Sequence, residues 1–447
     1  MRFKKYLVVV FLISGALTIW FWRPSSPWSK VTQAPPFPSV PQETQPALVR
    51  SSQIPALVGF SSPKPVVAAD PAGNVLIVAH GFTNVPLGSD ILLWRSIDRG
   101  ETWTPPVNLT IQAQDGEIFF DPWLETDRRG HYYFIHVLRS DGRPFLRRSK
   151  DSGQTWSSVL PIEWKSCDRP VLSVSSNGRR LVVASSLGEI VDHGPADHTR
   201  NQPTNFRFPS GIFNSQDYGD SWKKVSSPFD AEHAIPFSVV CNDEDAIAVS
   251  WIVAGHGSRS VVTVTTNSGK TWTTTTLVES LQPDRQHPFN GERFPVLALD
   301  GQSGLHVAYV TAGATVVMIR HTPDWKDWNE ARRLSSETAE EVRMAAIDAC
   351  GSMVHVTWLE RVDTNWHAYY RGSRDFGQTW SPALCLSEAM VLADNTVANG
   401  FQITSDDDQS SVRDDGTGRV HAVWSIQGGR VIHAIIDWSN REETASE

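Results

Sequence analysis

An eight-residue pattern recurs along the chain, and it restricts the possible folds more than any other feature. Its clearest copy is SRDFGQTW at 373–380, and close copies lie at 96–103, 149–156, 215–222 and 265–272. In each copy a short polar side chain can accept backbone N–H groups, and the glycine can adopt a positive φ. The closing tryptophan supplies a large apolar anchor. Each copy therefore predicts a hairpin turn whose tryptophan packs inward.

The pattern resembles the Asp-box of the sialidase-like (BNR-repeat) proteins, and a weaker sixth copy lies at 322–328. The resemblance implies that the box residues support the turn and take no part in catalysis. These structural residues are Asp98, Asp151, Asp217, Asn267 and Asp375.

A second repeat predicts the number of units. Pairs of apolar runs separated by a short turn lie at 66–80, 123–137, 171–185, 237–251, 296–310, 344–358 and 403–425. Five of the first runs follow a proline, which a strand tolerates at its first residue. A third strand leads into each box and a fourth leaves it. Four strands therefore recur every roughly 50–65 residues, as in β-propellers. We predict an all-β propeller of seven four-stranded antiparallel blades; six blades, as in known sialidases, is the alternative.

The seventh unit lacks a fourth strand before the chain ends in a polar tail at 440–447. The segment PALVRS at 46–51 resembles PALCLS at 382–387, which follows the clearest Asp-box. A strand from the start of the domain would remove the open edge and join the two ends of the ring. The predicted propeller therefore covers 46–439 and is closed by its N-terminal strand.

The N-terminus has the features of a membrane segment. Three basic residues precede an apolar run that extends from Tyr6 to Trp22 and ends in two tryptophans flanking Phe21. We predict a signal-anchor at 1–23, with the propeller outside the cytoplasm, in the periplasm or the extracellular space. The alternative is a cleaved signal peptide and a secreted protein. The proline-rich segment 24–45 is predicted to be an extended linker.

The net charge argues against some kinds of partner, and the cysteine spacing argues against a metal or redox site. The net charge of -9 and a pI near 5.9 argue against nucleic acid or an anionic membrane surface as the main partner. The four cysteines lack metal-binding and redox spacing, so disulfides and buried free thiols both remain open. No cofactor and no metal ion are predicted.

Candidate site residues come from the loops on the propeller face opposite the Asp-boxes. Three arginines, Arg169, Arg293 and Arg343, occupy similar places at the starts of first strands, and together could bind a carboxylate or sulfate. The alternative is that each arginine pairs with its adjacent acid. The further ligand-binding candidates are His233 and Trp123, and the catalytic candidates are Glu292, Asp121 and Asp168.

The segment 292–295 resembles the Arg-x-Pro motif of sialidases, whose arginines hold a sugar carboxylate. Here, however, it follows the fourth Asp-box, and no tyrosine nucleophile is recognisable. We therefore predict a tethered propeller that binds carbohydrate or protein at the channel mouth. The alternatives are a sialidase-like exo-glycosidase and an assembly factor, as in the seven-bladed Asp-box proteins that help to build photosystems.

Overall fold

The computed structural model describes residues 45–438 except for 57–59, 84–88, 111–118, 139–141, 159, 161, 163, 165–166, 188, 191–205, 208–209, 230–233, 254–257, 282–293 and 404–408. The predicted anchor, almost the whole linker and the polar tail lie outside these residues. In the described part of the chain every regular element is a strand, and no helix there could span a bilayer.

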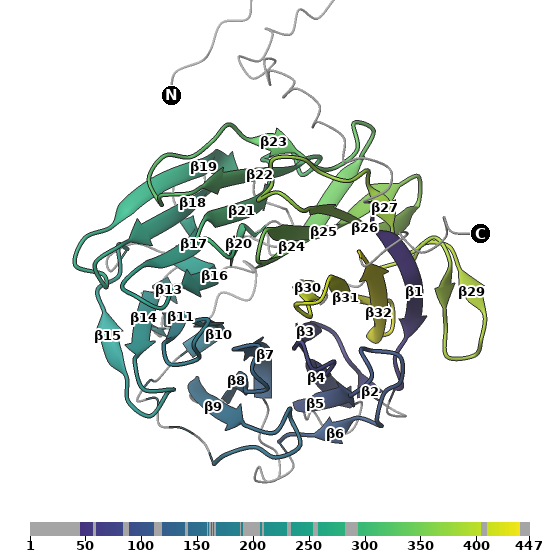
Figure 1. The fold of residues 1–447 in the computed structure, drawn as a ribbon, viewed down its shortest axis with the longest axis horizontal. Helices are drawn as coiled ribbons and strands as arrows, with labels where there is room; N and C mark the ends of the chain where they lie inside the picture. The colour runs from purple at the N-terminus through teal and green to yellow at the C-terminus, as the bar shows by residue number, and fades with distance from the viewer. Residues whose placement is uncertain are drawn as a thin grey trace, which may run out of the picture. The chain divides into compact units, whose positions relative to one another are not determined.

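The strands form seven antiparallel blades around a central channel (Figure 1). The first, channel-lining strands are β3 (Val66–Ala69), β7 (Phe119–Thr126), β10 (Cys167–Val174), β16 (Ala234–Cys241), β20 (Val296–Leu299), β24 (Glu341–Cys350) and β30 (Ser411–Asp414). The second strands are β4 (Val75–Thr83), β8 (Tyr132–Leu138), β11 (Leu181–Leu187), β17 (Ile247–Val253), β21 (Leu305–Val310), β25 (Met353–Val362) and β31 (Arg419–Ile426).

The outer strands complete the blades. The third strands are β5 (Ser89–Ser96), β9 (Arg143–Ser149), β14 (Ser210–Ser215), β18 (Ser258–Thr265), β22 (Val317–Thr322), β26 (Asn365–Ser373) and β32 (Arg430–Asp437). The fourth strands are β6 (Val107–Asn108), β15 (Lys223–Val225), β19 (Thr273–Leu281), β23 (Arg332–Arg333), β27 (Leu384–Cys385) and, in blade 7, β1 (Ala47–Gln53). In blade 2 the fourth position is held by Leu160, which bridges to Leu146.

Short pairings extend two of these sheets and form one separate two-stranded sheet. Strand β2 (Phe60–Ser61) pairs with β4, β12 (Glu189–Ile190) pairs with β13 (Phe206–Arg207), and β28 (Met390–Val391) pairs with both β1 and β29 (Val397–Ala398). Each first strand contacts the first strand of the next blade, and β30 contacts β3, so the ring closes with seven members. The prediction of seven blades is confirmed.

The ring is closed by the N-terminal strand, as predicted. Strand β1 pairs antiparallel with β32, from Ala47 opposite Asp437 to Gln53 opposite Ile432. Arg50 then reaches into the first Asp-box, where its Nη2 donates to the carbonyl of Gly100 at 2.6 Å. The last blade is thus built from both ends of the domain and is tied to blade 1.

The Asp-boxes connect third to fourth strands. In blade 6, Asp375 Oδ1 accepts the N–H of Thr379 at 2.8 Å and Oδ2 accepts its hydroxyl at 2.6 Å. The same two bonds are made by Asp98, Asp151 and Asp217, and Asn267 keeps the bond from the backbone. The glycine of each of the five good boxes has positive φ, and in all but the box of blade 6 it also lies close to the previous blade. At Gly269, with φ +84, a Cβ would lie 2.0 Å from Val225 Cγ1.

The core consists of the faces between adjacent blades. All seven residues of β17 are buried, because the neighbouring blades cover both faces of the second strands. Of the box tryptophans, Trp380 is buried and its four counterparts in the other good copies are half-buried. All four cysteines are free, with Cys167 and Cys241 buried.

The predicted proline starts of the first strands are correct only in part. Strands β3 and β20 begin after Pro65 and Pro295, whereas β7, β10 and β16 begin before their prolines and continue past them. Each of these three pairings shifts register next to the proline, which has no N–H to donate. Strand β24 has the same register shift between Arg343 and Ala346 without a proline, so the bulge recurs among the first strands and the prolines are accommodated beside it.

Candidate functional site in the central channel

Three charged side chains lie on channel-lining strands that are otherwise largely apolar. Glu125 on β7, Asp348 on β24 and Arg413 on β30 each lie close to the turn that leads into the second strand of the blade. A fourth, Arg128, lies in the turn between β7 and β8 with φ 59. First strands surround the channel, so these four side chains from blades 2, 6 and 7 can meet inside it.

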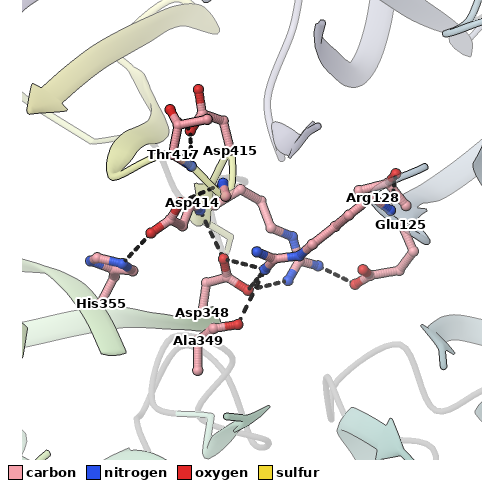
Figure 2. A network of polar contacts seen from close by, with 11 residues as sticks. Glu125, Arg128, Asp348, Ala349, His355, Asp414, Asp415 and Thr417 are labelled. Atoms are coloured by element: carbon pink, nitrogen blue, oxygen red, sulfur yellow. Dashed lines mark hydrogen bonds and ion pairs between the residues drawn. The ribbon is translucent and has the colours of Figure 1, made fainter. Parts of the chain in front are cut away.

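The four side chains form one ion-pair network, and Figure 2 labels Glu125, Arg128 and Asp348 of it. Arg128 Nη2 donates to both carboxylate oxygens of Asp348, at 3.2 and 3.0 Å, and to the carbonyl of Ala349 at 3.2 Å. Arg413 Nη1 donates to Asp348 Oδ1 at 3.0 Å, and its Nη2 donates to Glu125. Blade 2 is not adjacent to blade 6 or blade 7, so the network crosses the channel.

A buried chain of hydrogen bonds positions β30 behind this network. Asp414 donates its backbone N–H to Asp348 Oδ2 at 2.8 Å, and its own carboxylate lies 2.9 Å from His355 Nε2. His355 Nδ1 lies 2.7 Å from the hydroxyl of Tyr370. Burial opposes ionisation of Asp414, but the hydrogen bond and charge of His355 outweigh it and lower the pKa of this carboxyl.

The network is only partly shielded from water. The exposed fraction of the side chain is 5% for Asp348, 14% for Glu125, 17% for Arg413 and 27% for Arg128. Burial raises the pKa of Glu125 above its usual value, although Arg413 and the indole N–H of Trp123 favour the charged form.

The network forms one side of a cavity of about 520 Å³ in the channel. The opposite side comes from blades 3, 4 and 5, where Val174, Val240 and Leu299 line the cavity and remain partly exposed. One wall thus offers ion-paired side chains, and the other combines aliphatic side chains with polar ones such as Ser176, Asn242 and Asp243. The lining includes residues of the turns between first and second strands, so the cavity extends towards the Asp-box face.

The predicted catalytic residue Asp121 lies in a different cluster, at the opposite end of its strand. Its Oδ1 lies 3.0 Å from Lys64 Nζ, and its backbone N–H donates to His80 Nε2 at 3.1 Å. Burial would raise the pKa of Asp121, but the charges of Lys64, His80 and Arg169 outweigh it and hold this pKa at about 2. Asp121 is thus ionised at neutral pH and cannot serve there as a proton donor.

The predicted arginines differ in their surroundings. Arg169 lies over the rings of Phe294 and Phe237, at 4.4 and 5.2 Å from their centroids. Arg343 pairs with Glu341 at 2.7 Å and lies over Trp366. Arg169 and Arg343 therefore contact different residues. The pairing of Arg343 with Glu341 agrees with the alternative that each arginine pairs with its adjacent acid.

The remaining predicted residues divide into two groups. Glu292, Arg293 and His233 lie outside the described residues, so their roles remain predictions. Asp168 is exposed, and its backbone carbonyl accepts the hydroxyls of Ser185 and Ser186. Trp123 lines the cavity and supports Glu125.

The network residues were not among the sequence candidates. A charge within an apolar first strand, two or three residues before the turn, is the signal that marks Glu125, Asp348 and Arg413. That signal is visible only when the seven units are aligned at their turns.

Comparisons with known proteins bear on the fold alone. Neither a protein-family model nor a curated protein matches the chain. A protein of unknown function from Dyadobacter fermentans is 14% identical with a TM-score of 0.47, over 88% of this chain and 99% of that one. A Hadza microbial sialidase is 15% identical with a TM-score of 0.47, over 84% of this chain and 65% of that one. YCF48 bound to a D1 peptide is 13% identical with a TM-score of 0.45, over 89% and 98%. By its seven blades and its Asp-box turns, the chain has the fold of an Asp-box β-propeller.

Proposed function

We propose that this propeller binds a carbohydrate in its central channel. The mixed polar and apolar lining of the cavity supports this function. A pyranose ring has an edge of hydroxyl groups and an apolar C–H face, and the cavity offers charged and polar side chains together with the aliphatic side chains of Val174, Val240 and Leu299. Its volume of about 520 Å³ suits a small ligand, since pockets of this kind measure roughly 300–1,000 Å³.

Glycan binding is tested with the purified full-length protein on an array of neutral and acidic glycans. Val240→Trp fills the apolar side of the cavity without changing a charge, so it should weaken binding at least tenfold. Val397→Trp is a matched control, since Val397 is 66% exposed and does not line the cavity. The proposal fails if the natural protein binds no glycan, or if Val240→Trp binds as well as the control.

A second function, glycoside hydrolysis, is favoured by the raised pKa of Glu125 and the nearby carboxylate of Asp348. A protonated acid and an ionised partner are the two groups that most glycosidases require. Release of fluorophore from a panel of fluorogenic glycosides, including a sialoside, tests for turnover. Turnover that is lost in Glu125→Gln would replace the binding function with a catalytic one, and absence of turnover on every substrate would leave hydrolysis without support.

We further propose that segment 1–23 holds the propeller on the outer side of the cell membrane, as the basic and apolar pattern of the N-terminus predicts. Fractionation of cells with and without external protease tests this location. Full-length protein in the membrane fraction that external protease removes would support it. Protein recovered from the medium without residues 1–23 would favour the secreted alternative.

A further inference from the structure

Blade 5 brings three side chains of metal-ligand type together, away from the channel network. Asp300 follows β20, His306 lies on β21 and His321 lies on β22. One potential ligand atom from each residue lies within 4.8 Å of the other two, the only such group in the described residues. His306 Nε2 and His321 Nε2 lie 2.8 and 3.6 Å from the same oxygen, Asp300 Oδ2.

The backbone fixes this arrangement. His306 and His321 are direct cross-strand partners, so their side chains share one face and their rings stack with centroids 4.2 Å apart. Asp300 Oδ1 accepts the backbone N–H groups of Gln302 and Gly304, at 2.9 and 2.8 Å. These bonds orient the carboxylate so that Oδ2 faces both imidazoles.

The hydrogen bonding of the group is incomplete. The side chain of His306 is fully buried, and its Nε2 takes the short contact with Asp300 Oδ2. His321 Nε2 is also buried, yet it has no hydrogen-bond partner among the described residues. If this nitrogen carries a lone pair, it faces a carboxylate oxygen and is repelled. A cation shared by the three atoms removes that repulsion.

A glycine keeps the space beside these atoms free of a side chain. A Cβ on Gly304 would lie 2.5 Å from Asp300 Oδ2 and 2.6 Å from His321 Nε2. Any larger residue would therefore force the carboxylate or the imidazole to move.

We propose that Asp300, His306 and His321 bind a divalent transition-metal ion such as Zn²⁺. Imidazole nitrogen and carboxylate oxygen are ordinary zinc ligands at about 2.0–2.2 Å, and a three-ligand site leaves a position for water. Tetrahedral ligands at that distance lie about 3.3 Å apart, between the two separations seen here. The ion would join the turn after β20 to strands β21 and β22.

Blade 2 supplies a matched control in the equivalent turn. Asp127 Oδ1 accepts the N–H of Arg129 at 2.8 Å, and Asp127 Oδ2 lies 2.8 Å from His131 Nδ1. This turn has the aspartate and one histidine but no third ligand in the described part of the chain. His131→Ala therefore removes an Asp–His pair without touching the proposed site.

The test measures metal binding directly. Full-length protein, purified without a polyhistidine tag and stripped with a chelator, is titrated with Zn²⁺ by calorimetry and with Co²⁺ by visible absorption. His321→Ala should lose one equivalent of tightly bound metal, whereas His131→Ala should match the natural protein. Gly304→Ala keeps all three ligands but should weaken binding at least tenfold. Circular dichroism checks that each variant is folded.

Two results would overturn the site. One is a natural protein that binds neither ion, and the other is His321→Ala with the stoichiometry and affinity of the natural protein. His321 is partly exposed, so its replacement remains informative if removal of the fully buried His306 prevents folding. Neither readout depends on a glycan, so the metal site and the proposed function can fail independently.

Discussion

Arg128 of blade 2 and Asp348 of blade 6 meet across the central channel, with one guanidinium nitrogen shared between both carboxylate oxygens at 3.2 and 3.0 Å. Contacts between neighbouring blades alone would leave the channel open. The carboxylate of Asp348 also accepts hydrogen bonds from the Arg413 guanidinium and from the backbone N–H of Asp414. Blades 2, 6 and 7 are therefore linked through one carboxylate. This relationship makes Asp348 both a part of the cavity wall and a connection within the ring.

Replacing Asp348 by alanine should strongly destabilise the fold. The change leaves two partly buried guanidinium groups without their shared anion. Breaking a fully buried ion pair from one side costs about 3–5 kcal/mol, so a loss near the lower end, about 3 kcal/mol, is expected here. The free energy of unfolding in urea measures this cost. Arg148 and Asp220 form a more exposed pair at 3.5 Å, so Asp220→Ala should cost less than about 1 kcal/mol. Equal losses in the two variants would show that the cross-channel network contributes little.

The acid stability of the protein should depend on Asp121. Its pKa is about 2 in the folded chain against an ordinary value of 3.8, so ionised Asp121 stabilises the fold above about pH 4. This contribution, about 2 kcal/mol from the difference in pKa, is lost as the pH falls towards 2. The gap in unfolding free energy between the natural protein and Asp121→Asn should therefore narrow from pH 6 to pH 2.5. A gap that does not change with pH would contradict the prediction.

The sequence predicted the scaffold far better than the site. The Asp-boxes and the similarity of 46–51 to 382–387 depend on local turn chemistry and strand patterning, and both were confirmed. The network of Glu125, Asp348 and Arg413 depends on which blades face one another across a closed ring. Arg128 of blade 2 and Asp348 of blade 6, which meet in this network, are 220 positions apart in the sequence. No local sequence pattern can indicate a contact between residues so far apart in the chain.

The proposed metal ligands escaped prediction for a similar reason. Asp300, His306 and His321 have none of the short spacings of helical or hairpin metal motifs, because each lies at a different strand or turn of blade 5. Only the direct pairing of His306 with His321 brings them together. Cross-strand register, which sequence patterns determine only loosely, decides the geometry of this group.

The carboxylate of an Asp-box should stabilise its turn without affecting ligand binding. In Asp375→Ala the N–H and the hydroxyl of Thr379 lose their acceptor, so the unfolding free energy should fall by about 1–3 kcal/mol. Asp375→Asn keeps the acceptor for the N–H, as Asn267 does in blade 4, and should lose less than half as much. Chemical denaturation measures both variants, and the glycan array checks binding. A folded Asp375→Ala protein that no longer binds glycan would contradict a purely structural role.

Closure of the ring should depend on residues 45–53 and not on the segment before them. Removal of residues 1–44 leaves all described strands in place, so this variant should keep cooperative thermal unfolding. Removal of 1–53 also deletes β1, which exposes the edge of β32 and breaks the Arg50 contact with Gly100. An unpaired edge favours pairing between chains, so the shorter variant should aggregate or unfold at a lower temperature. Size-exclusion chromatography and thermal melts distinguish the two variants, and a synthetic peptide of residues 45–56 should partly restore the shorter one. If both truncated proteins are equally stable and monomeric, β1 does not close the ring in solution.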